Sequence, residues 1–221
     1  MCYYSAMKKI MFVVALVIGL VILIFGLLMF NPLVFLPHSR ISIILPFPES
    51  VDSRTGLIPY GEKIEHNEAN GNPDGHAGID FGWNEKVEII ASHDGLISEV
   101  QNTSEGMNVT IRTLYYKTVY KELTDLSPKV KQFTTIKQGD LIGYPAIKER
   151  GSGETGPAGH GQVHWEFSST SMAIDRLCPM GYFDVSSRAR IEAIWAAVPE
   201  NNQFKKLYPD ICSGVFNGKE N

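Results

Sequence analysis

The sequence predicts a mainly β protein: an antiparallel β-sandwich or β-sheet core with an apolar helix before it and a C-terminal helix after it. Three observations support this prediction. Short strand-like runs, each closed by turn residues, follow one another between residues 78 and 169. A stretch of 21 uncharged residues lies near the N-terminus. One amphipathic helical pattern lies near the C-terminus.

The uncharged stretch, residues 10–30, predicts a transmembrane helix, because at about 1.5 Å per residue it spans a hydrocarbon core of about 30 Å. A buried core helix is rarely apolar on every face. A cleavable signal peptide would have a shorter apolar region and a small-residue cleavage site, which "NPLVFLPHSR" lacks. Lys8 and Lys9 precede the stretch, so the positive-inside rule predicts a single-pass protein of the cell membrane. Residues 1–9 would be cytoplasmic and the main domain extracytoplasmic.

Residues 31–57 are expected to link the membrane to a β domain that covers residues 58–178. Gly, Asn and Pro between residues 55 and 75 indicate a long irregular loop. The runs expected to contain strands are "GIDFGW", "KVEIIASHDG", "LISEVQN", "MNVTIRTLYY", "KTVYKEL", "FTTIKQGDLIGY" and "QVHWEFSS". His93, within the second run, is expected in a turn.

Residues 179–221 are expected to form a helical extension that packs on the sheet. Ser186 or Ser187 is a plausible N-cap of its helix. The apolar residues at helical spacing are Ile191, Ile194, Trp195 and Val198.

Charge and cysteine content restrict the partners and the compartment. Without Lys8, Lys9 and Arg40, 17 basic residues face 24 acidic ones, and a net charge near −7 gives no basis for nucleic-acid binding. Cys178 and Cys212 both fall in the outer part, where thiols oxidise, so a disulfide between them is predicted. Two buried free thiols are the alternative.

A candidate metal site begins in "HAGIDFG". His76 and Asp80 are four residues apart, and the surrounding glycines disfavour a helix. On a straight strand they would stand about 13 Å apart, too far for one zinc ion. A bend at Ala77-Gly78 would bring them together, with His164 as third ligand from another strand. Two nitrogens, one carboxylate oxygen and an open fourth position form a catalytic zinc shell. The alternatives are a hydrogen-bonded turn for the His–Asp pair and a packed or surface imidazole for His164.

Three segments together resemble the lysostaphin-type, or LytM-like, family of zinc peptidases. They are "HAGIDFGWNEKVEIIASHDGLISEV", "IKQGDLIGY" and "TGPAGHGQVHWEF", and the resemblance covers residues 58–178. It implies a compact antiparallel β-sandwich with an open groove over the sheet. It also implies one zinc ion held by His76, Asp80 and His164, and cleavage of peptide cross-links in bacterial peptidoglycan.

The sequence departs from the family at two assisting histidines, whose places are taken by Gln162 and Glu122. A zinc-bound water needs a base and a donor to the developing oxyanion. Glu122 is the candidate base, or alternatively a surface carboxylate. Gln162 can donate an amide N–H but cannot shuttle a proton. His160 shares strand parity with Gln162 and His164 and is a further candidate groove residue.

Two functions remain open from the sequence. The first is a membrane-anchored zinc peptidase that acts on wall peptides, motivated by the complete metal shell. The second is a catalytically impaired domain that binds wall peptides or regulates another wall hydrolase, motivated by the two replaced histidines. The expected partners are peptidoglycan or another surface peptide, the lipid bilayer through residues 10–30, and other envelope proteins. A purely structural zinc ion is disfavoured because three ligands leave a position open.

Overall fold

The computed structural model describes residues 11–23, 40–51, 56–63, 74–148, 160–170 and 175–216. The chain divides into two compact units, Met1–Ser39 and Arg40–Asn221. In the first unit, residues 11–23 are helical and exposed. No helix within the described ranges is long and apolar enough to cross a membrane. The other residues of the predicted span, 10 and 24–30, lie outside those ranges.

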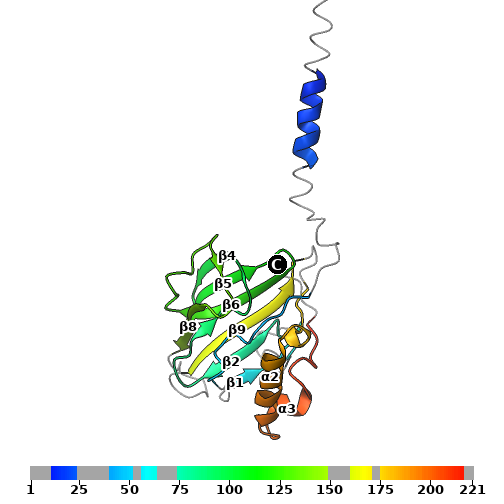
Figure 1. Cartoon of the computed structure of the whole chain (residues 1–221). Coiled ribbons are helices and arrows are strands. Elements are labelled where there is room, and N and C mark those ends of the chain that lie inside the picture. The colour runs from blue at the N-terminus through cyan, green and yellow to red at the C-terminus, as the bar shows by residue number, and fades with distance from the viewer. Residues whose placement is uncertain are drawn as a thin grey trace, which may run out of the picture. The chain divides into compact units, whose positions relative to one another are not determined.

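The second unit is built on one antiparallel sheet (Figure 1). Its strands are β1 (Gly56–Ile58), β2 (Ile79–Trp83), β3 (Ile89–Ile90), β4 (Gly95–Thr103), β5 (Gly106–Arg112), β6 (Tyr116–Thr124), β7 (Thr135–Ile136), β8 (Leu141–Lys148) and β9 (His160–Ser169). The strand order is β1-β2-β9-β8-β6-β5-β4-β7, with β3 paired to β8 and a further pairing between β9 and β6. The predicted mainly β, antiparallel class is therefore confirmed.

Two strand predictions differ from the structure in extent. The run "KVEIIASHDG" contributes the two-residue strand β3 and, with its last residue, the start of β4. Strand β1 lies inside the stretch expected to be an irregular loop, because its three residues pair antiparallel with β2 from Gly56 opposite Gly82 to Ile58 opposite Asp80. Local propensity carries no signal for such a strand, since its partner lies more than twenty residues away.

Alternation along β9 separates the hydrophobic core from a polar face. Val163, Trp165 and Phe167 are fully buried and belong to the core cluster. The residues that alternate with them, Gln162, His164 and Glu166, point to the opposite face, because successive side chains of a strand alternate. The strand thereby presents a row of polar groups on a rigid apolar support.

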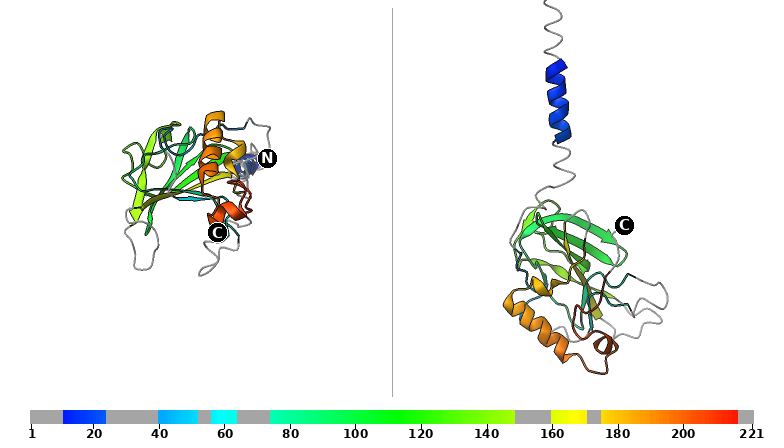
Figure 2. Two further views of the ribbon diagram at one scale, coloured as in Figure 1. Left: turned by 90° about the horizontal axis from the view of Figure 1, so that it is seen from below. Right: turned by 90° about the vertical axis from the view of Figure 1, so that its right-hand side faces the viewer.

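The C-terminal residues form η2 (Pro179–Gly181), α2 (Val185–Ala197) and α3 (Gln203–Leu207), and Figure 2 shows the helices beside the sheet. The predicted C-terminal helix is confirmed. Its predicted N-cap is wrong: Asp184 caps α2, and its carboxylate accepts the backbone N–H of Ser187 at 2.7 Å. The predicted disulfide joins Cys178 to Cys212 and so connects the segment before η2 to the segment after α3.

Candidate metal centre

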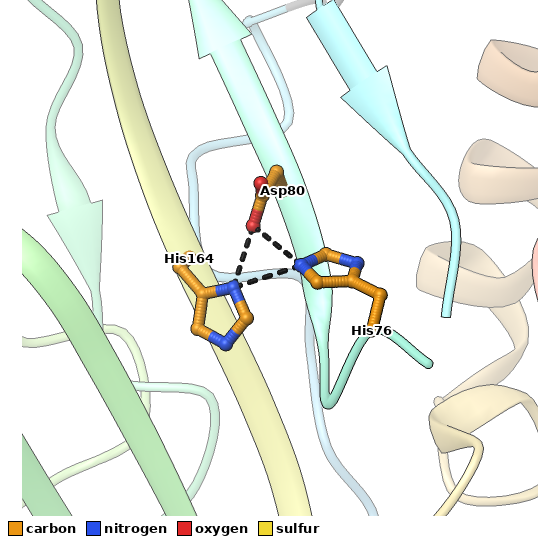
Figure 3. A group of neighbouring side chains, drawn as sticks. All are labelled: His76, Asp80 and His164. Atoms are coloured by element: carbon orange, nitrogen blue, oxygen red, sulfur yellow. Dashed lines mark hydrogen bonds and ion pairs between the residues drawn. The ribbon is translucent and has the colours of Figure 1, made fainter. Parts of the chain in front are cut away.

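Three side chains meet on the polar face of the sheet (Figure 3). Asp80 lies on β2 directly opposite His164 on β9, and His76 comes from the turn that precedes β2. Asp80 Oδ1 is 2.7 Å from His164 Nδ1 and 3.1 Å from His76 Nε2. The two ring nitrogens are 3.0 Å apart. The three predicted ligands are thus brought together, with His76 and Asp80 buried.

The turn before β2 has the bend that the spacing of His76 and Asp80 requires. Ala77 and Gly78 form a bend, and the strand begins only at Ile79. A Cβ atom on Gly78 would lie 2.3 Å from the carbonyl oxygen of Trp165. Glycine is therefore required at this position by the close approach of β9, and it allows the turn to return His76 to Asp80.

The geometry fits a zinc ion. The three donor atoms form a triangle with edges of 2.7 to 3.1 Å. Tetrahedral zinc ligands at about 2.0–2.1 Å stand about 3.3 Å apart, so small outward movements of the side chains accommodate the ion. Two imidazole nitrogens and one carboxylate oxygen are a zinc-type donor set, and three protein ligands leave a fourth position for water or substrate.

Neighbouring groups orient each ligand. The Nδ1–H of His76 donates to the carbonyl oxygen of Pro59 at 3.0 Å, which directs Nε2 toward the centre. The Nε2–H of His164 donates to Glu166 at 3.0 Å, which directs Nδ1 toward the centre. Gln162 donates its amide N–H to Asp80 Oδ2 at 3.1 Å, so Oδ1 is the oxygen that faces the two histidines. Such outer contacts fix the tautomer and orientation of metal-ligating side chains.

Glu166 is the centre of a buried ionic cluster, made up of Glu166, His164, Lys121 and Arg176. Its carboxylate is 2.6 Å from Lys121 Nζ and 2.7 Å from an Arg176 guanidinium nitrogen. The Glu166 and Arg176 side chains are only 1% and 6% exposed, whereas Lys121 is 38% exposed. Lys121 lies on β6 directly opposite His164 on β9. With the segment that carries Arg176, three segments contribute to this cluster.

The charges of the cluster shift the titration of its members. Burial alone would raise the pKa of Asp80, but His76 and His164 hold that pKa well below its usual range. Burial would lower the pKa of His164, but Asp80 and Glu166 outweigh it and raise the pKa to about 9. Burial also opposes the ionisation of Glu166, yet His164, Lys121 and Arg176 lower its pKa to about 2. The site therefore favours positive charge between its carboxylates, which a bound metal cation supplies in place of a proton.

The other predicted site residues occupy different places. Gln162 lies on the polar face and contacts a metal ligand, as described above. Glu122 follows Lys121 on β6, has a φ of 64° and is 8% exposed, so it is not an exposed surface carboxylate. His160 is the first residue of β9, paired with Lys148, and its side chain lies outside the described part of the structure.

Sequence reasoning missed several residues around the site. Glu166 had a detectable signal, because it follows His164 by two residues and so shares its face on a strand. Arg176 and Pro59 carry no local signal.

His93, expected in a turn, is buried, and its ring nitrogens contact Thr118 Oγ1 at 3.1 Å and the Asp94 carbonyl at 2.8 Å.

A comparison with protein families finds one that matches this region. The model of Peptidase family M23 matches residues 74–176, which include all three candidate ligands. No curated protein sequence matches the chain.

Three solved structures with a similar chain fold are the following. Csd3 of Helicobacter pylori is 18% identical, with a TM-score of 0.46, over 66% of this chain and 34% of that one. A zinc-containing peptidase of Vibrio cholerae is 19% identical, with a TM-score of 0.47, over 62% and 39% of the two chains. The catalytic domain of the antimicrobial peptidase lysostaphin of Staphylococcus simulans is 20% identical, with a TM-score of 0.41, over 58% and 91%. The chain spans about a third of the length of Csd3, and these likenesses concern the fold alone.

Proposed function

We propose that the protein is a zinc-dependent peptidase of Peptidase family M23, whose model matches residues 74–176, and that it hydrolyses peptides of bacterial peptidoglycan. The observation that carries the proposal is the convergence of His76, Asp80 and His164 on one point of the polar face. Each ligand is held there by a separate outer contact, and the donor set suits a hydrolytic zinc ion.

Two further side chains, Glu122 and Gln162, are proposed to supply the other parts of hydrolysis. When bound, zinc supplies a Lewis acid and lowers the pKa of a coordinated water. Glu122 is the proposed acceptor of the proton that the attacking water loses, because a carboxylate fills this role in other zinc peptidases. Gln162 is the proposed donor to the substrate oxyanion. Its amide nitrogen carries two hydrogens, and the contact with Asp80 uses one of them.

The proposed location is the outer face of the cell membrane, with residues 10–30 as a single-pass anchor. The uncharged stretch and the preceding Lys8 and Lys9 support this orientation. The disulfide between Cys178 and Cys212 supports an oxidising compartment for the main domain. An anchor of this kind would keep the site close to wall peptides and to other envelope proteins.

The second candidate function is a zinc-retaining domain that binds wall peptides or regulates another hydrolase without cleaving a bond. The specific observation in its favour is the replacement of both assisting histidines, by Gln162 and Glu122. An amide cannot shuttle protons, so proton transfer would rest on Glu122 alone.

A hydrolysis assay separates the two functions. Full-length protein in detergent, loaded with one equivalent of zinc, is incubated with purified peptidoglycan, and newly released amino groups are measured. We expect release by the wild type, loss of release after chelation, and recovery when zinc is restored. Glu122→Gln should abolish release while zinc stays bound, whereas Glu200→Gln, the same change at an exposed carboxylate between α2 and α3, should have no effect. Zinc-loaded wild type that releases nothing would favour the binding function.

A further inference from the structure

We propose that the C-terminal segment 211–215, locked by the Cys178–Cys212 disulfide, is a positioning element of the metal centre. It acts on the ligand His76 through an intermediate segment, residues 59–62, which we call the strap. This inference rests on the proposed metal site, and it assigns a role in metal binding to residues beyond the family match, which ends at Arg176.

The strap holds His76 by its backbone and by its ring. The Gly61 N–H donates to the His76 carbonyl at 2.8 Å, and the His76 N–H donates to the Glu62 carbonyl at 2.8 Å. The His76 ring donates to the Pro59 carbonyl at 3.0 Å. His76 lies outside every strand, so these three bonds replace the sheet pairing that holds the other two ligands on β2 and β9.

The C-terminal segment in turn holds the strap. The Tyr60 N–H donates to the Ile211 carbonyl at 3.0 Å. A Cβ atom on Gly214 would lie 2.5 Å from the Tyr60 carbonyl oxygen, and one on Gly61 would lie 2.3 Å from Gly214 backbone atoms. Gly75, next to His76, is equally close to the segment, since its Cβ would lie 2.6 Å from the Val215 carbonyl oxygen. The backbones of strap and segment are therefore in direct contact.

The disulfide joins the C-terminal segment of this contact to the residues next to Arg176. Cys212 lies inside the segment, and Cys178 lies two residues after Arg176. Tyr60 contacts the segments at both ends of the disulfide. Its N–H donates to the Ile211 carbonyl, and its hydroxyl donates to the Arg176 carbonyl at 3.0 Å. The Arg176 side chain continues to Glu166, the residue that orients the ligand His164. The disulfide thus completes a closed series of contacts, through segment 211–215, the strap, Arg176 and Glu166, which we call the circuit. It reaches both histidine ligands.

Opening the circuit loosens one metal ligand and leaves the sheet pairing of the other two in place. Asp80 and His164 stay paired on β2 and β9 when segment 211–215 is released. His76 loses the support of its orienting carbonyl, and loss of an outer contact to a metal ligand lowers affinity about 10- to 100-fold. The oxidised protein should therefore bind zinc more tightly than the protein without the disulfide.

The test measures the zinc dissociation constant of the full-length protein in detergent by competition with a chromophoric chelator. The first variant, Cys178→Ser with Cys212→Ser, removes the bond without leaving its two thiols free to bind zinc. The second, Gly214→Ala, pushes the segment from the strap and leaves the disulfide intact. We expect each to weaken zinc binding at least about 10-fold. Gly181→Ala is the matched control, because the nearest heavy atom to its new Cβ would lie 3.8 Å away.

A remote core variant separates positioning from general destabilisation. Ile97→Ala removes buried side-chain atoms on β4, far along the sheet order from β2 and β9. It should lower the free energy of unfolding and leave the zinc affinity within about twofold of the wild type. Equal zinc affinity in wild type and both circuit variants would overturn the inference, as would an equal loss in Ile97→Ala. Failure of the wild type itself to bind zinc would overturn the proposed function together with it.

Discussion

Glu166→Gln removes one negative charge from the buried cluster and keeps the shape of the side chain. The amide oxygen can still accept the Nε2–H of His164, so the geometry of the ligand is largely retained. What is lost is the ionic partner of Arg176 and Lys121, which contact the carboxylate at 2.7 and 2.6 Å. The variant therefore isolates the electrostatic part of the contact.

The expected size of the effect follows from the exposure of each partner. Arg176 is 6% exposed, and breaking a buried ion pair costs about 3–5 kcal/mol of unfolding free energy. Lys121 is 38% exposed, so its share is at most about 1 kcal/mol. For the metal, loss of a carboxylate behind a ligating histidine weakens binding about 10- to 100-fold, or about 1.4–2.7 kcal/mol.

Two measurements check this prediction: urea unfolding of the metal-free protein and zinc affinity by chelator competition. Glu192→Gln is the matched control, since it makes the same change in an exposed pair with Arg188 on α2. The control should lose less than about 1 kcal/mol and bind zinc normally. The reasoning is refuted if Glu166→Gln binds zinc within about threefold of the wild type and unfolds at the same urea concentration.

Three further predictions concern other parts of the molecule. Gln162→His restores a proton-transferring ring beside the shell and should raise the rate of amino-group release from peptidoglycan at least about 10-fold. An unchanged rate would contradict a catalytic role for position 162. Burial lowers the pKa of His93, so the unfolded state binds the proton more readily. The contribution of His93 to stability should therefore be complete above about pH 6.5 and be lost as the pH falls below it. Urea unfolding at several pH values should show this decline in the wild type and a weaker decline in His93→Gln. Removing the Cys178–Cys212 bond, which spans 34 residues, should cost about 4 kcal/mol of unfolding free energy, and a loss under about 1 kcal/mol would contradict the constraint.

The fold and the metal shell were predictable because their signals are local. The bend at Ala77-Gly78 follows from the glycine and from the distance that four strand residues would impose. His164 was recognisable within its strand, and the disulfide followed from two cysteines in the outer part. Each of these predictions depended on residue type within a short window or on a motif.

The supports of the site were not predictable, because they join segments far apart in sequence. The Pro59 carbonyl, Arg176 and the strand β1 have ordinary local sequences, and only tertiary packing brings them to the ligands. The N-cap of α2 was missed for a different reason. Asp184, Ser186 and Ser187 all carry capping side chains near the start of the helix, and Asp184, the residue directly before Val185, accepts the bond.

The most direct test of the metal centre is the zinc content of the full-length protein after equilibrium dialysis, measured by mass spectrometry of the element. The wild type should hold one zinc ion per chain. His76→Ala and His164→Ala should each hold close to none under the same conditions, because two remaining ligands bind zinc weakly. Wild-type protein without zinc, or variants with the wild-type content, would contradict the assignment of these residues as the metal site.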